Sequence, residues 1–123
     1  MKQVDNIFKW LEALESGEFK QGKCRLGDAK RGYCCLGLGC IATGIPYSPR
    51  DGVSDRFMHA TGLMTETGDL GCERFYNRPS LVEINDFTNA GFKRIAKLIR
   101  SRPEDLFIPE VAKAFREKLK EIH

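Results

Sequence analysis

The sequence predicts a small, mainly helical domain. Three segments repeat apolar residues at the three- and four-residue spacing of an amphipathic helix, namely residues 4–14, 92–99 and 111–122. The chain has 123 residues, which suits one domain with an ordinary hydrophobic core. We therefore expect a single-domain helical bundle over residues 1–123, with a small α+β fold as the alternative.

The first helix is the clearest element of the sequence. Its apolar stripe runs from Val4 to Leu14, and Ser16-Gly17 supplies a C-terminal stop. Trp10 lies beside this stripe, so we expect it to straddle the edge of the buried face.

A glycine-rich basic segment follows, over residues 18–32. Gly22, Gly27 and Gly32 recur at intervals of five, which indicates turns. The segment is predicted to form a loop or short hairpin, with residues 23–26 and 31–34 as its arms. Residues 19–21 could extend as a short strand.

Residues 33–43 are small or apolar on every side, which is typical of a buried helix. Each glycine within it costs about 1 kcal/mol relative to alanine, a cost better tolerated where another backbone comes close. A buried strand is the alternative for so short an apolar run. Gly44 and Pro46 end the element in either case.

Shorter helices are expected in the second half of the chain. Ser54 can cap a helix over residues 55–61 that stops at Gly62. Residues 78–80 open another helix, whose apolar face carries Leu81, Ile84 and Phe87. We expect a turn at 85–86, an irregular polar stretch over 65–77, and a loop over 47–53.

Two further helices complete the expected fold. Thr88 or Asn89 can cap a helix carrying Phe92, Ile95, Ala96 and Ile99, and Pro103 is expected to close it. Pro109 then suits the first position of a last helix.

The composition narrows the class of protein. The chain holds 20 basic and 17 acidic residues, and the net charge of +3 is too small by itself to name a nucleic-acid partner. We find no secretory leader and no apolar run long enough to span a bilayer. An odd number of cysteines then predicts reduced thiols in a cytoplasm. These are Cys24, Cys34, Cys35, Cys40 and Cys72.

Several short runs resemble a known group of proteins. They are the Trp10–Gly17 opening, which fits W-[IL]-x-A-L-x-S-G, the Y-C-C-L-G run of residues 33–37, and weaker matches at 60–63, 84–86 and 92–99. The chain resembles, over about residues 9–100, small uncharacterised proteins of tailed bacteriophages and prophages. The resemblance implies an accessory protein made in the cytoplasm of an infected bacterium. It implies no activity, and it transfers no catalytic residue.

The cysteines admit two interpretations. Zinc sites favour cysteine pairs two to four residues apart, and Cys34, Cys35 and Cys40 lack that spacing. We therefore predict no metal and no cofactor, and take these thiols as small buried apolar groups. The alternative is a nucleophilic Cys34 at a helix start, with His59 as base and Asn85 or Asp86 orienting it.

Basic residues gather in two places. The basic side chains of the glycine-rich segment, with only Asp28 opposing them between residues 20 and 31, suit an anionic ligand or an acidic partner. Its candidate binding residues are Lys20, Lys23, Arg25, Lys30, Arg31 and Tyr33. The second cluster suits a solvated helix face or a nucleic-acid face, although residues 103–109 are too long for a helix-turn-helix. Its residues are Lys93, Arg94, Lys97 and Arg100.

The function predicted first is binding without catalysis. The partner would be a host protein or a small anionic ligand, in host takeover or in blunting host defence. Nucleic-acid binding is the runner-up, and a thiol-dependent enzyme is the third alternative.

Overall fold

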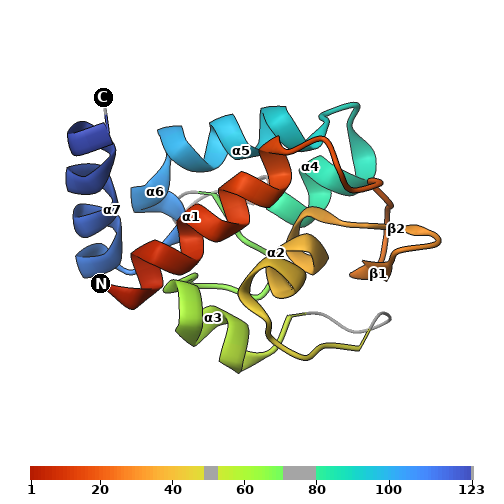
Figure 1. Ribbon diagram of the computed structural model, residues 1–123, viewed down its shortest axis with the longest axis horizontal. Helices are drawn as coiled ribbons and strands as arrows, with labels where there is room; N and C mark the ends of the chain where they lie inside the picture. The colour runs from red at the N-terminus through yellow and green to blue at the C-terminus, as the bar shows by residue number, and fades with distance from the viewer. Residues whose placement is uncertain (49–52, 71–79, 123) are drawn as a thin grey trace.

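The computed structural model describes residues 1–48, 53–70 and 80–122, and it confirms the mainly helical fold (Figure 1). The described residues hold helices and one two-stranded hairpin. In chain order these are α1 (Lys2–Glu15), β1 (Gly27–Asp28), β2 (Gly32–Tyr33), α2 (Cys35–Thr43), α3 (Asp55–Thr61), α4 (Leu81–Phe87), α5 (Phe92–Ser101), α6 (Pro103–Leu106) and α7 (Pro109–Ile122).

Helix α1 is the centre of the molecule. Figure 1 shows it running across the middle, with α5 along one side, α2 and α3 along the other, and α7 near its N-terminal end. The predicted apolar stripe from Val4 to Leu14 is buried. All these neighbours meet α1 through its apolar side chains, so the described part of the chain has one hydrophobic core.

The expectation for Trp10 was wrong. Its side chain is completely buried rather than at the edge of the stripe. The indole Nε1 donates to the carbonyl oxygen of Cys35 at 2.8 Å, and the ring meets Phe57 edge to face at 5.4 Å. A buried indole needs such an acceptor. That acceptor lies 25 positions away in the sequence.

Helix α2 is the predicted buried helix, and its glycines allow close packing. A Cβ atom on Gly37 would lie 1.9 Å from the Leu26 carbonyl oxygen, and one on Gly39 would lie 2.7 Å from the Phe57 ring. The helix therefore sits directly against the loop before the hairpin and against α3. Gly44 ends it in the left-handed conformation.

The start and stop signals around α3 and α4 were partly correct. Ser54 caps α3 and Gly62 ends it, as predicted. Ser80 caps α4 by accepting from the Glu83 amide at 3.1 Å. However, α4 continues past 85–86 to Phe87, and that side chain is 77% exposed rather than part of an apolar face.

The expectation for the start of α5 was wrong, whereas its end was predicted. Gly91, not Thr88 or Asn89, precedes the helix, and no side chain caps it. The helix ends at Ser101, just before Pro103, and Pro103 also begins the short helix α6. Pro109 begins α7 as predicted.

Some predicted segments lie partly outside the described residues. These are positions 49–52 of the loop over 47–53, positions 71–77 of the polar stretch over 65–77, and positions 78–79 before α4. Cys72 lies among them. Within the ranges that the structure covers, the search for a helix able to span a membrane finds no candidate.

Candidate anion-binding site

The basic segment folds around β2. Gly27 and Asp28 pair with Tyr33 and Gly32 in an antiparallel hairpin, and Gln21 forms a single parallel bridge on the other side of Tyr33. The predicted hairpin is therefore present, but its first arm begins at Gly27 instead of residue 23. The expected strand over 19–21 is reduced to that one bridge.

The five-residue glycine spacing has a packing reason. A Cβ atom on Gly22 would lie 2.6 Å from the Gly32 carbonyl oxygen, and one on Gly27 would lie 2.0 Å from the same atom. Gly27 and Gly32 also have φ angles of +88° and +94°, which favour glycine. The three glycines thus bring three lengths of backbone together.

Helix α4 holds this backbone in place through Asn85. The side chain is completely buried. Its Nδ2 donates to the Gly22 carbonyl oxygen at 2.9 Å, and its Oδ1 accepts from Gln21 Nε2 at 2.9 Å and from the Cys35 amide at 3.2 Å. Asn85 therefore joins the basic loop, α2 and α4.

Two neighbouring contacts extend this attachment. Asp86 Oδ1 accepts from the Cys24 amide at 2.8 Å, and Cys24 has a φ angle of +66°. Lys23 Nζ donates to the Thr88 carbonyl oxygen at 3.0 Å. The sequence had suggested Asn85 or Asp86 as an orienter of a catalytic base, whereas the structure gives both a role in positioning the loop backbone.

A depression of about 420 Å³ lies on this hairpin, and we name it the hairpin depression. Three cationic side chains and one carboxylate line it. The carboxylate of Asp28 already accepts from the Arg31 amide at 2.8 Å, within the turn. The lining residues are Lys23, Arg25, Gly27, Asp28, Arg31, Gly32 and Ser48.

The structure divides the six predicted binding residues. Lys23, Arg25 and Arg31 line the depression. Lys20 and Lys30 are exposed but do not line it. Tyr33 is only 9% exposed, and its ring packs edge-on against Phe19 at 6.1 Å, so its role in the structure is to support the hairpin from the core.

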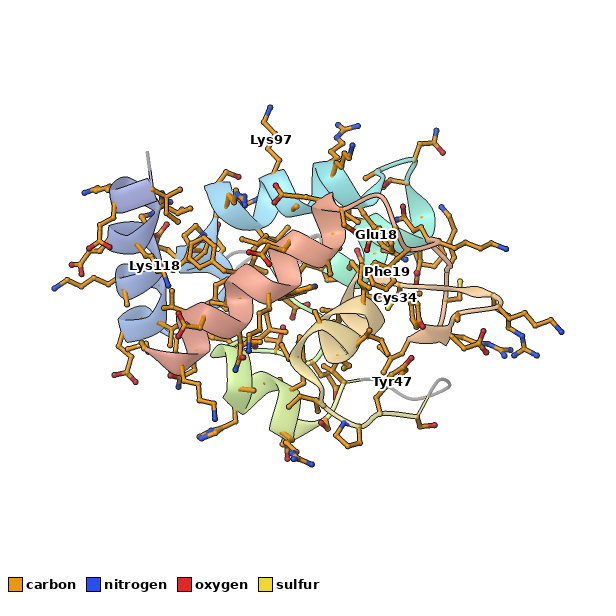
Figure 2. The ribbon with its side chains drawn as sticks, viewed as in Figure 1. Glu18, Phe19, Cys34, Tyr47, Lys97 and Lys118 are labelled. Atoms are coloured by element: carbon orange, nitrogen blue, oxygen red, sulfur yellow. The ribbon has the colours of Figure 1, made fainter. Side chains whose placement is uncertain are left out.

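Sequence reasoning did not assign Tyr47 to this site. Its hydroxyl donates to the Gly27 carbonyl oxygen at 2.9 Å, and this hydrogen bond holds the first strand of the hairpin in place (Figure 2). Partial burial raises the pKa of the Tyr47 hydroxyl, so it stays a donor at neutral pH. Its place in a loop without periodicity left no sequence signal for this contact.

The thiols of α2 are shielded from solvent. Cys34 is 4% exposed and caps α2, its Sγ accepting from the Gly37 amide at 3.3 Å. Burial raises the pKa of Cys34, raises that of Cys35 well above its usual value, and raises that of Cys40 to about 12. Cys24 is exposed.

The predicted Cys34–His59 pair is not assembled. Cys34 lines a cavity of about 270 Å³ with Cys24 and Asp86, whereas His59 lines a different and larger hollow. The nucleophile interpretation required a Cys34 in contact with solvent and an imidazole in the same cleft. Among the residues that the structure covers, no group of three or more His, Cys, Asp or Glu side chains could hold a metal ion.

That larger hollow, which we name the α1–α3 hollow, has a volume of about 930 Å³. It was not predicted from the sequence. Lys2, Lys9 and Arg56 line it with one carboxylate, Asp55, so its balance of charged residues equals that of the hairpin depression. It differs in being larger and in lying away from the glycine backbone that Asn85 and Asp86 hold, and it offers a matched set of control residues.

Three of the four residues of the second basic cluster form no ion pair with a carboxylate in the described part of the chain. Lys93, Arg94 and Lys97 are exposed on α5, and Figure 2 shows Lys97 pointing away from the body of the protein. Arg100 instead forms two hydrogen bonds to Glu15, at 2.8 and 3.1 Å. Figure 1 shows α5 along the top of the molecule and the hairpin at its right-hand end, and Lys23 of the hairpin segment reaches the Thr88 carbonyl oxygen between them.

Comparison with known proteins adds one match. Residues 1–43 are similar to a family described as Domain of unknown function (DUF8296). The matched segment runs from α1 through the hairpin to the end of α2, and it contains the three cations of the depression. No curated protein and no solved structure matches the chain.

Proposed function

We propose that this protein is a phage-encoded accessory protein of the bacterial cytoplasm that acts by binding, without catalysis. Its ligand is a small multivalent anion, such as a phosphate- or carboxylate-bearing metabolite, held in the hairpin depression. The observation that carries the proposal is that Arg25 and Arg31 line one glycine-lined hollow together with Lys23, whose Nζ already donates to the Thr88 carbonyl oxygen.

The attachment of the hairpin supports this proposal energetically. Ordering a loop around a ligand costs free energy that weakens binding. Here the contacts of Asn85, Asp86 and Tyr47 already order the backbone. The cations are therefore carried on a framework that needs little rearrangement.

The chemistry of the lining also favours an anion. Arginine presents a planar fork of donors that matches carboxylate and phosphate oxygens. The volume of about 420 Å³ is within the range of small-molecule sites. Among the described lining residues, Asp28 is the one carboxylate beside three cationic residues, so it does not cancel their charge.

Titration calorimetry with inorganic phosphate, pyrophosphate and citrate tests the proposal. We expect pyrophosphate or citrate to bind more tightly than phosphate, and the double variant Arg25→Ala/Arg31→Ala to weaken binding at least tenfold. The matched control Lys9→Ala/Arg56→Ala removes two cations from the α1–α3 hollow and should change nothing. Equal losses in both double variants, or no anion binding, would contradict the proposal.

Nucleic-acid binding stays as a second candidate because Lys93, Arg94 and Lys97 are exposed along one helix. It predicts affinity for duplex DNA or for RNA that falls steeply with salt. The ion pair of Arg100 with Glu15 reduces the available charge, which is why we place this function second.

A further inference from the structure

A groove of about 520 Å³ lies between α4 and α5, and neither predicted function uses its apolar lining. We name it the α4–α5 groove. Ala90 and Ile95 are buried in its floor, and Ile84 and Leu98 are half-buried along it. These side chains offer an apolar surface to whatever enters the groove.

The two hydroxyls that line the groove are already satisfied. Thr88 Oγ1 donates to the Ile84 carbonyl oxygen, and Ser101 Oγ donates to the Leu98 carbonyl oxygen at 2.9 Å. In both cases the acceptor is a carbonyl oxygen three or four residues earlier in the adjoining helix. An apolar occupant therefore leaves no lining hydroxyl without a partner.

Charge on the groove has one sign. Arg94 and Lys97 line it, and none of the carboxylates that the structure describes does. Lys97 extends outward from α5 in Figure 2. The cations and the apolar side chains thus form a surface that is apolar along its length and positively charged at its edge.

An exposed aromatic side chain, Phe87, lies three residues after the groove residue Ile84 and so on the same side of α4. Phe87 ends α4, directly before the groove residue Thr88, and it is 77% exposed. It is the most exposed large apolar side chain among the described residues. Aromatic side chains next to a groove are typical anchors of protein interfaces.

We propose that the α4–α5 groove binds an acidic amphipathic helix of a partner protein. Apolar residues at i, i+3/i+4 and i+7 of that helix would lie along the groove and against Phe87. Its acidic side chains would meet Arg94 and Lys97, since charge complementarity sets the orientation and the rate of docking.

The apolar lining separates this partner from a nucleic acid. A phosphate backbone gains nothing from burying Ile84 and Leu98, whereas a helix with leucines gains free energy from the apolar surface that it removes from water. A second copy of the chain is also a poor occupant. The apolar face of α1 is already buried in its own core, and so is that of α7 from Val111 to Phe115, which leaves only Ile122 exposed at the end of α7.

The test uses a fluorescent 18-residue peptide with leucines at helical spacing and glutamates beside them. Two further peptides serve as probes, one with the same composition scrambled and one with lysine in place of every glutamate. We expect the acidic amphipathic peptide to bind at least tenfold more tightly than either, by fluorescence anisotropy. Amide chemical-shift changes should concentrate in α4 and α5.

Variants locate the contact. Phe87→Ser and Lys97→Glu should each weaken the peptide at least fivefold, and both side chains are exposed, so folding should persist. Lys120→Glu on α7 is the matched control and should have no effect. Arg25→Ala/Arg31→Ala should also leave peptide binding unchanged, which separates this surface from the hairpin depression.

Four results would overturn the proposal. The first is equal binding of the scrambled peptide, and the second is a set of shifts outside α4 and α5. The third is a concentration-dependent dimer that Phe87→Ser abolishes, because it would show that a second copy covers the groove. Tight duplex DNA binding that competes with the peptide would assign the cations of α5 to nucleic acid instead.

Discussion

The two basic regions of this protein have similar charge but different surroundings. In the hairpin depression, Lys23, Arg25 and Arg31 surround glycine backbone that hydrogen bonds hold in place. On α5, Arg94 and Lys97 border an apolar groove. The comparison shows that the surface between the cations, either glycine backbone or apolar side chains, decides which partner a basic region suits, rather than the number of cations.

The two regions are also built by different forces. The hairpin depends on close backbone packing and on one buried amide side chain, Asn85. Helix α5 is held by ordinary apolar burial of Ile95, Ala96 and Ile99. Each region should therefore fail under substitutions that leave the other unchanged, and the predictions below use this contrast.

The largest effect is expected from Gly27→Ala. The new Cβ atom would lie 2.0 Å from the Gly32 carbonyl oxygen, at a φ angle of +88°. Overpacking against rigid backbone, added to the left-handed conformation, should lower the free energy of unfolding by about 3 kcal/mol or more. Urea unfolding measures this, and anion binding should be lost while binding of the acidic peptide to α5 is kept.

Gly44→Ala is the control for that substitution. Gly44 also has a positive φ angle, +70°, but a Cβ atom there would meet nothing within 4 Å. Its cost should be about 1 kcal/mol, from conformation alone. If both glycine variants lose the same stability, the hairpin does not depend on close packing and the contrast between the regions is wrong.

The next effect concerns Asn85→Ala. The substitution removes the acceptor of Gln21 Nε2 and of the Cys35 amide, and leaves the Gly22 carbonyl oxygen without its donor. Unsatisfied buried groups should lower the free energy of unfolding by about 2–3 kcal/mol. Asn89→Ala, at an exposed position, should change it by less than about 0.5 kcal/mol.

Amide hydrogen exchange sharpens this test. Faster exchange at Gly22 and Cys35 in Asn85→Ala, with unchanged exchange in α5, would show that Asn85 acts on the hairpin. Uniformly faster exchange over the whole chain would show instead that the hairpin and the helical core unfold as one unit.

Periodicity explains why the helices could be predicted from the sequence. The stripes of α1 and α5 and the Ser54 and Gly62 signals of α3 act through neighbours a few residues away. The site depends on contacts between distant residues, such as Asn85 with Gln21, 64 positions apart. A single sequence carries no local signal for such a pair.

One clue to Asn85 was present in the sequence. It lies four residues after Leu81 on a short helix, and so on the same buried face. A polar residue in that position requires internal partners. The contact of Trp10 with Cys35 and the exposure of Phe87 had no comparable clue, because both depend on how the helices pack.

A smaller, pH-dependent effect should come from the buried thiols beneath the hairpin. Burial raises the pKa of Cys40 to about 12, whereas the unfolded thiol has a value near 9.0. Since the folded value is the higher one, this stability is complete below pH 9 and is lost as the pH rises toward 12. At pH 10 the Cys40 thiol should therefore lower the free energy of unfolding by about 1.4 kcal/mol.

Two measurements check the thiols. The pH dependence of urea unfolding above pH 9 should become shallower in Cys40→Ala than in the natural sequence. Labelling with iodoacetamide at pH 8 should modify exposed Cys24 much faster than Cys34, Cys35 or Cys40. Rapid labelling of Cys34 would instead restore the thiol-enzyme hypothesis.

The smallest effect is expected from Arg100→Ala, and it divides the cations of α5 by role. The pair with Glu15 is partly exposed and has two-point geometry, so its removal should lower the free energy of unfolding by at most about 1 kcal/mol. A double-mutant cycle with Glu15→Ala measures that coupling.

Binding of the acidic peptide to Arg100→Ala should stay within twofold of the unsubstituted protein, because Arg100 does not line the α4–α5 groove. A loss as large as that of Lys97→Glu would mean that the binding face continues along α5 past the groove, and that α5 presents an extended basic surface of the kind a nucleic acid prefers.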